Sequence, residues 1–103
     1  MPLLQYKSTD QIGHQCFLEK WDKGSEEPPH SHPHDDMTVV VEGHMSVQFF
    51  TKMNGRLVKD GPRLHIRAGE TGYIAADRIH DAKYHDHCKL VYVHDGPFGF
   101  RKH

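Results

Sequence analysis

The sequence predicts an all-β fold, either a small barrel or a sandwich, in a single domain that spans residues 1–103. Helical periodicity is absent, whereas short segments rich in Val, Ile, Phe and Tyr recur roughly every 8–12 residues between Gly, Pro and Asn. Short strands at such regular spacing are typical of all-β barrels and sandwiches. A chain of 103 residues has room for one hydrophobic core, so we expect one domain.

The first strand is expected at Gln15–Trp21. The following segment, Asp22–Pro29, is predicted to be a loop because it contains Pro28 and Pro29. Proline cannot donate a hydrogen bond to a central ladder. Strand pairing is therefore expected to resume near His30.

Met37–Glu42 is expected to be a strand that is covered on both faces, because Val39, Val40 and Val41 follow one another. A second subunit could supply that cover, so we predict a homodimer formed by sheet against sheet. The composition agrees, since only 36% of residues are hydrophobic and the mean hydropathy is -0.74. A small domain of this kind needs a metal, a partner subunit or both to fold firmly.

A tight hairpin turn is predicted at Asn54-Gly55, because both residues tolerate a positive φ. The strand before it, His44–Thr51, alternates and places Met45, Val47 and Phe49 on one face. The remaining strands are expected at Leu57–Val58, Leu64–Arg67, Gly72–Ile74, Ile79–Tyr84 and Lys89–His94. The two phenylalanines of the tail, Phe98 and Phe100, are expected to pack on a neighbouring surface.

Composition excludes several classes of partner. The formal net charge is -1, and no stripe of Lys and Arg could neutralise several phosphates, so we expect no nucleic acid. No run of apolar residues is long enough to span a membrane, and Met1–Asp10 lacks the pattern of a secretory signal. Cys16 and Cys88 lie in no disulfide or zinc-ribbon pattern. A reducing cytoplasm is the expected location.

Histidine is unusually frequent, with 11 in the chain and three of them between His30 and His34. Residues two apart on a strand share a face and lie about 6.7 Å apart, which allows two imidazoles to bind one ion. His30 and His34 would be about 13 Å apart on an extended strand, so only two of His30, His32 and His34 can bind the same metal. Asp36 has the same parity and adds a hard anionic ligand that favours Fe, Mn, Ni or Zn.

The histidines and Asp36 lie at fixed intervals from two glycines. Gly24 is followed after five residues by His30-Ser31-His32, after three more by Asp36, and after six more by Gly43. The pattern resembles the first motif of the cupin superfamily in every interval, with Asp36 where the family usually has Glu.

A second motif of the same superfamily is matched more loosely. Gly69 opens it at the right distance, and His80 falls on the position of the last metal ligand. Ala75 and Asp77 replace its Pro and Gly, and Tyr84 stands where Asn is usual. The two motifs span 24–84, more than half of the chain.

The resemblance implies a double-stranded β-helix, or jelly roll, with one divalent metal (Fe, Mn, Ni or Zn) inside the barrel mouth. The implied ligands are His30, His32, Asp36 and His80, and His34 would be a rim residue. Because Asp is one methylene shorter than Glu, Asp36 could instead orient an imidazole, which leaves three His and water around the metal.

Strand alternation indicates which other polar side chains share a face with one another. Tyr84 shares a face with His80, and Tyr92 shares one with His94, so all three of Tyr84, Tyr92 and His94 are candidates for proton transfer or substrate contact. The alternative is that they are core aromatics or satisfied polar groups. The other histidines are expected to be solvated surface residues; they are His14, His44, His65, His85, His87 and His103.

Four protein ligands would leave open positions on an octahedral metal, which is typical of a catalyst. The resemblance implies a mononuclear metal enzyme, a dioxygenase, isomerase or lyase, that acts on a small polar oxygen-bearing substrate. The alternative is a non-catalytic, metal-dependent module that binds a small molecule or a sugar. A purely structural metal site is less favoured, because such sites saturate their coordination.

Overall fold

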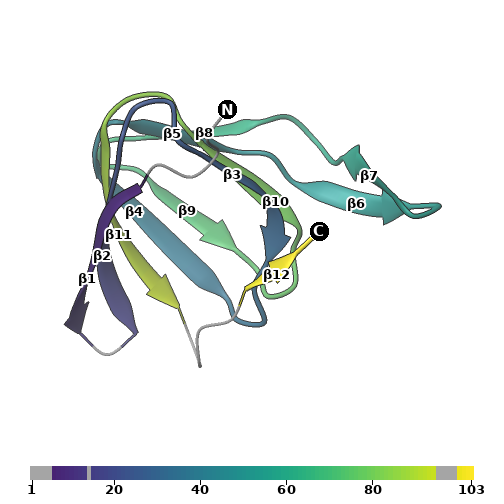
Figure 1. Cartoon of the computed structure of the whole chain (residues 1–103), viewed down its shortest axis with the longest axis horizontal. Coiled ribbons are helices and arrows are strands. Elements are labelled where there is room, and N and C mark those ends of the chain that lie inside the picture. Colours follow the sequence, from purple (N-terminus) through teal and green to yellow (C-terminus); the bar gives the residue numbers. More distant parts are fainter. Residues whose placement is uncertain (1–5, 14, 95–99) are drawn as a thin grey trace.

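Two five-stranded antiparallel sheets face each other in the computed structural model, which describes residues 6–13, 15–94 and 100–103 (Figure 1). Sheet A has the strand order β1 (Tyr6–Gly13), β2 (Cys16–Trp21), β11 (Cys88–His94), β4 (Asp36–Glu42), β9 (Thr71–Ile74). Sheet B has the order β12 (Arg101–Lys102), β3 (Glu26–Ser31), β10 (His80–Tyr84), β5 (His44–Val47), β8 (Leu64–Arg67). The all-β prediction is confirmed. The described residues include no helix that is long and apolar enough to cross a membrane.

The two sheets enclose an apolar core, to which both contribute. Its buried members are Trp21, Val40, Met45, Val47, Ile66, Ala82, Tyr84, Cys88 and Leu90. Trp21 and Tyr84 stack across the sheets with ring centroids 4.4 Å apart. The same interior also buries several histidines and acids, so the core is polar at one end.

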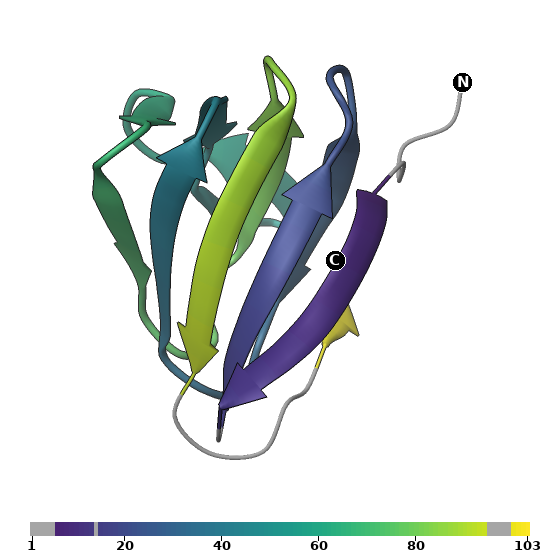
Figure 2. The same cartoon turned by 90° about the vertical axis from the view of Figure 1, so that its left-hand side faces the viewer.

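One face of β4 is covered within the single chain, and cover for its other face by a second subunit stays a prediction. Val40 is fully buried, whereas Val41 is 45% exposed and Met37 is 39% exposed. Within one chain the strand is therefore covered on a single face, because sheet B packs against only one side of sheet A. Figure 2 shows the other side of sheet A, which no part of the described chain covers.

The prediction of a loop at Asp22–Pro29 is wrong for its second half, because β3 begins at Glu26 and runs through Pro28 and Pro29. The register explains how the strand tolerates them. His80 pairs with His30 and Ala82 pairs with Glu27, so β3 carries an extra residue in a bulge between these pairs. Both prolines lie at this bulge, where the ladder does not need their missing N–H groups.

The hairpin prediction is confirmed, while the strand before it is shorter than expected. Asn54 and Gly55 have φ of 52° and 77° and join β6 (Phe50–Met53) to β7 (Arg56–Lys59). This hairpin projects from the barrel at the right of Figure 1. The expected strand His44–Thr51 is interrupted after Val47, where the backbone N–H of Gln48 donates to the Asp81 carboxylate at 2.9 Å instead of to a neighbouring strand.

The later strands lie within a residue of their expected positions, and two further strands were not predicted. β1 is polar and β12 has only two residues, so neither carries the apolar alternation that marks a strand. Through β12 the tail returns to the barrel, where Phe100 stacks on His30 with centroids 4.7 Å apart. This agrees with the expectation for Phe100, and Phe98 lies outside the described residues.

Candidate metal centre

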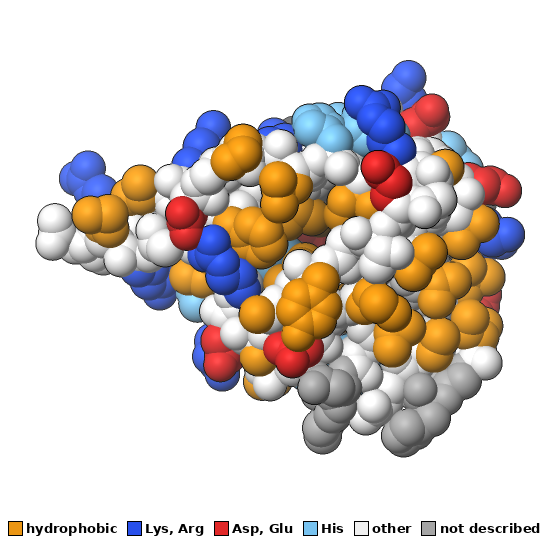
Figure 3. All heavy atoms as spheres, turned by 180° about the vertical axis from the view of Figure 1, so that it is seen from behind, with side chains coloured by type: hydrophobic (Ala, Val, Ile, Leu, Met, Phe, Trp, Pro, Cys, Tyr) orange, Lys and Arg blue, Asp and Glu red, His pale blue; other side chains and the backbone are white. Residues whose placement is uncertain are grey.

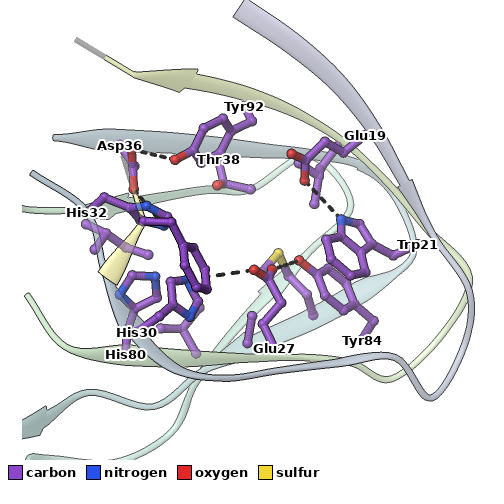
Figure 4. A pocket seen from close by; sticks show the side chains of 16 residues that line it. Glu19, Trp21, Glu27, His30, His32, Asp36, Thr38, His80, Tyr84 and Tyr92 are labelled. Atoms are coloured by element: carbon purple, nitrogen blue, oxygen red, sulfur yellow. Dashed lines mark hydrogen bonds and ion pairs between the residues drawn. The ribbon is translucent and has the colours of Figure 1, made fainter. Parts of the chain in front are cut away.

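Three buried imidazoles converge at the polar end of the barrel interior (Figure 4). His30 lies on β3 directly opposite His80 on β10, and His32 follows two residues after His30. The ring centroids are 4.3 Å apart for His30 and His80 and 4.8 Å apart for His30 and His32. One nitrogen of each ring lies within 4.8 Å of the others. The structure thus brings together three of the four predicted ligands, and their binding of a metal stays a prediction.

Backbone carbonyls fix which nitrogen of two rings is free to bind a metal. His30 Nδ1 lies 2.7 Å from the carbonyl oxygen of Pro28, and His80 Nδ1 lies 2.8 Å from that of Arg78. A carbonyl oxygen can only accept, so both Nδ1 atoms carry the proton and donate it. Each Nε2 atom is left with its lone pair, as in metal-ligating histidines whose other nitrogen is held by the backbone.

The electrostatics of the site keep these rings neutral. Burial, followed by the neighbouring His30, lowers the pKa of His80 to about 3. Burial likewise lowers the pKa of His30. Because an imidazole must be neutral to bind a metal, no proton has to be displaced from these two rings at pH 7. Three imidazoles are a donor set that fits one divalent ion of the zinc, iron or nickel type.

Asp36 stands beside the three histidines and does not join their group. Its Oδ2 atom lies 3.9 Å from Nε2 of His32, while Oδ1 lies 2.6 Å from Nδ1 of His34. Oδ1 also accepts a hydrogen bond of 2.7 Å from the hydroxyl of Tyr92. This arrangement supports the role in which Asp36 orients an imidazole, and the direct ligand role stays a prediction.

His34 is not the rim residue that the resemblance implied. It is 4% exposed, and its ring stacks between His32 and His94, with centroids 5.1 and 4.6 Å away. The chain bends at Pro33 and His34 between the two strands, so strand parity no longer applies there. The bend turns His34 inward, toward Asp36.

A small cavity of about 90 Å³ extends from the three histidines into the barrel. The predicted proton-transfer candidates Tyr84 and Tyr92 both line it. His94 does not, because its ring packs on Phe17 with centroids 5.3 Å apart. Burial raises the pKa of both tyrosines, so they remain protonated donors at neutral pH.

Sequence reasoning missed two carboxylates that line the same cavity. Glu27 accepts a 2.7 Å hydrogen bond from Tyr84, and its other oxygen lies 3.7 Å from Nε2 of His30. Glu19 accepts a 3.0 Å hydrogen bond from the indole of Trp21. A signal existed for Glu19, which shares the inward parity of Trp21 on β2. Glu27 fell in the predicted loop, so its orientation could not be inferred.

The buried Glu19 predicts an unusual dependence of stability on pH. Its pKa is raised from 4.5 to about 7, mainly by burial; the Trp21 hydrogen bond opposes this rise and the neighbouring Glu27 adds to it. Between these values the folded state holds the proton more tightly than the unfolded state, so Glu19 makes the protein less stable as pH rises. We expect Glu19→Gln to remove this loss, which amounts to at most about 3 kcal/mol.

Urea unfolding of both proteins at pH 5 and pH 8 measures this effect. The free energy of unfolding should fall from pH 5 to pH 8 by less in Glu19→Gln than in wild type. The exposed Glu42 on β4 provides the matched control, and Glu42→Gln should keep the wild-type difference between the two pH values. An unchanged difference in Glu19→Gln would contradict the prediction.

Asp77 stands where the second motif has Gly, and it adopts the backbone conformation that the Gly would have. Asp77 adopts φ of 63°, the left-handed conformation that Gly favours and that Asp tolerates better than most residues. Its N–H donates a 2.7 Å hydrogen bond to the carbonyl of His32. The turn before His80 therefore holds the segment that carries His32.

Comparisons with known proteins agree on the fold. No family model matches the sequence, and no curated protein sequence matches it significantly. A cupin-2 domain protein from Shewanella frigidimarina superposes with a TM-score of 0.67 at 19% identity, covering 90% of this chain and 83% of that one. Two enzyme structures cover similar shares of this chain. A DMSP lyase has a TM-score of 0.67 and 18% sequence identity and covers 85% of this chain. An oxalate oxidase has a TM-score of 0.64 and 20% sequence identity and covers 84% of this chain.

This chain spans 43% of the lyase and 44% of the oxidase, less than half of either enzyme. A further oxalate oxidase structure, at 20% identity, holds glycolate. Identities at this level establish the fold alone. The antiparallel sheets, the interior histidines and these neighbours together show that the chain has the cupin fold, a double-stranded β-helix.

Proposed function

We propose that the protein is a mononuclear divalent-metal enzyme that acts on a small polar oxygen-bearing molecule. The observation that carries this proposal is the position of His30, His32 and His80 at a partly open cavity rather than in a solidly packed core. A bound divalent ion would supply Lewis acidity toward an oxygen-bearing ligand, at positions that three imidazoles leave open.

The cavity limits what can bind. At about 90 Å³ it has room for a molecule of a few heavy atoms. Its described lining includes three carboxyl groups and no Lys or Arg. Only the ion itself would then offset negative charge, so a neutral or singly charged hydroxy or oxo compound fits better than a dianion.

Two pairs of side chains are placed to hold or move a proton. The Glu27 oxygen that does not accept from Tyr84 faces His30 and is available to take a proton from a bound molecule. On the opposite wall, Tyr92 donates to Asp36 and presents a hydroxyl to the cavity. A carboxylate base, and a tyrosine hydroxyl that is hydrogen-bonded to a second carboxylate on the facing wall, suit an isomerase, a lyase or a dioxygenase. The DMSP lyase and the oxalate oxidase show that the fold supports lyase and oxidase chemistry.

The test is reconstitution of the untagged protein with Fe(II), Mn(II), Ni(II) or Zn(II), followed by a screen of hydroxy acids, oxo acids, diketones and sugars. Oxygen uptake with Fe(II) alone would identify a dioxygenase, and turnover without oxygen with several metals an isomerase or lyase. Tight binding of the compounds without turnover by any metal would replace this proposal with a non-catalytic binding module. A coordination shell with no exchangeable water would identify a structural site.

We also propose a homodimer formed by the outer face of sheet A. Alternation places the following uncharged side chains there, on four adjacent strands: Leu18, Met37, Val39, Val41, Tyr73, Val91 and Val93. Figure 3 shows hydrophobic side chains gathered over this sheet, at the right of the view. The two lysines of the same parity, Lys20 and Lys89, pair at one end of β2 and β11, so a second copy of the face can cover the uncharged part without complementary charges.

Lysine on this face should separate the subunits. Val91 pairs with Val39 at the middle of the sheet, so the variant Val39→Lys/Val91→Lys would bury charge in the dimer. Light scattering should give about 24 kDa for wild type, twice the 11.9 kDa chain, and the chain mass for the variant. Val58→Lys, at an exposed valine of the β6–β7 hairpin, should remain dimeric. A monomeric wild type would overturn the proposal.

Two remaining expectations stay predictions. Cytoplasmic location is supported by Cys16 and Cys88, which are both free thiols in the structure. The absence of nucleic-acid binding rests on the balanced charge of the sequence.

A further inference from the structure

A second group of three histidines lies on the outer face of sheet B, away from the barrel interior. His44 is on β5, His65 is on the neighbouring edge strand β8, and His85 follows the end of β10. The sequence analysis treated all three as separate solvated residues. The pairing of β5 with both β8 and β10 brings them together, with the backbone N–H of His85 donating to the carbonyl of His44 at 2.9 Å.

The three rings meet closely. Their centroids are 4.6 Å apart for His44 and His85, 4.9 Å for His44 and His65, and 5.4 Å for His65 and His85. One nitrogen from each ring lies within 4.8 Å of the other two. Nε2 of His44 and Nδ1 of His65 are 2.7 Å apart, so in the metal-free protein these two nitrogens share one proton.

Neighbouring side chains hold one ring of this group in place. Nε2 of His85 forms a 2.6 Å hydrogen bond with Oγ of Ser46, and this oxygen accepts a hydrogen bond of 3.0 Å from Arg63. Arg63 also forms a bidentate pair with the carboxylate of Asp81, at 3.0 and 2.6 Å. The contact through Nε2 leaves Nδ1 of His85 for a ligand, and Asp81 offsets the charge of Arg63 beside the group.

We propose that His44, His65 and His85 form a second metal site, for a divalent ion of the zinc type, on the outside of the barrel. Three imidazoles are a donor set that Zn²⁺, Ni²⁺ and Cu²⁺ prefer over Mg²⁺ or Ca²⁺. Tetrahedral zinc with bonds of about 2.1 Å needs ligand nitrogens about 3.4 Å apart. When the ion replaces the shared proton, the 2.7 Å distance between His44 Nε2 and His65 Nδ1 must lengthen toward this value. His65 is exposed on an edge strand, so its ring is free to make this movement.

The site differs from the barrel centre in access. His65 and His85 are exposed and His44 is partly so, whereas the barrel histidines are all buried. Three protein ligands leave a fourth position of a tetrahedral ion to solvent. An ion bound here would exchange with the medium and would have no enclosed cavity around it, so this site and the barrel centre can be tested separately.

The experiment counts zinc by equilibrium dialysis and elemental analysis of untagged, metal-free protein loaded with ZnCl₂. Wild type is expected to bind two equivalents. His65→Gln/His85→Gln should bind one, and should retain the equivalent that is lost in His30→Ala/His80→Ala. The matched control is His87→Gln, since His87 is an exposed histidine of the same turn outside the group, and it should still bind two.

Cobalt provides a second readout that does not depend on activity. Co²⁺ at the outer site should add the intense visible bands of a tetrahedral complex to the spectrum, so the bands should be weaker in His65→Gln/His85→Gln than in wild type and unchanged in His87→Gln. If the barrel variant does not fold, the comparison of wild type with the two outer-face variants still decides the question. Equal zinc binding by wild type and His65→Gln/His85→Gln would overturn the proposal, whatever the outcome for catalysis.

Discussion

The variant His30→Ala/His80→Ala is expected to lose the metal of the barrel centre and all metal-dependent turnover. It removes the two Nε2 ligands that backbone carbonyls hold in place and leaves His32 as the single imidazole of the group. Loss of groups that merely orient a ligand already weakens metal binding about 10–100-fold, so loss of two ligands should weaken it by more. The measurement is metal content after dialysis, in a His65→Gln/His85→Gln background so that the outer face does not contribute.

His34→Ala is the control for this prediction. His34 lies in the same His-rich segment and contacts Asp36, but it is outside the group of three. Its replacement should leave one equivalent at the barrel centre, with affinity lowered by up to about 10-fold because Asp36 loses a partner. A full equivalent in the His30→Ala/His80→Ala variant would show that the ion binds elsewhere.

Gly43→Ala is expected to destabilise the protein by about 2–5 kcal/mol, a large part of the total stability of a small domain. Gly43 adopts φ of 94°, which costs a residue with a Cβ roughly 1–2 kcal/mol. A Cβ here would also overlap the carbonyl oxygen of His87 and lie 2.9 Å from Cα of Cys88. Both obstacles are backbone, so they cannot move aside as a side chain would, and overpacking adds about 1–3 kcal/mol.

Gly69→Ala separates the two causes. Gly69 has φ of 87°, but a Cβ at this position meets no atom within 4 Å. Its cost should therefore be the conformational part alone, roughly 1–2 kcal/mol. Urea unfolding of both variants gives the comparison, and equal losses would show that the close approach to His87 is not what requires glycine at position 43.

The sequence by itself determined most of the strands and the choice of the three barrel histidines. Strand signals depend on alternation and on turn residues such as Asn54-Gly55, and these act within a few neighbouring residues. The interval from Gly24 to Gly43 is equally local, because it fixes how far His30 and His32 lie from the turns at either end. His80 was found because the second motif keeps its spacing from Gly69, even where Asp77 replaces a glycine.

The tertiary structure alone decided which other polar groups share a site. Glu27 reaches the barrel centre only because a bulge lets β3 continue through two prolines, and the bulge depends on pairing with β10. His44, His65 and His85 meet because β5 pairs with two strands that are distant in sequence. Alternation predicts the face on which a side chain lies, but the distance between side chains on different strands depends on register, which long-range pairing sets.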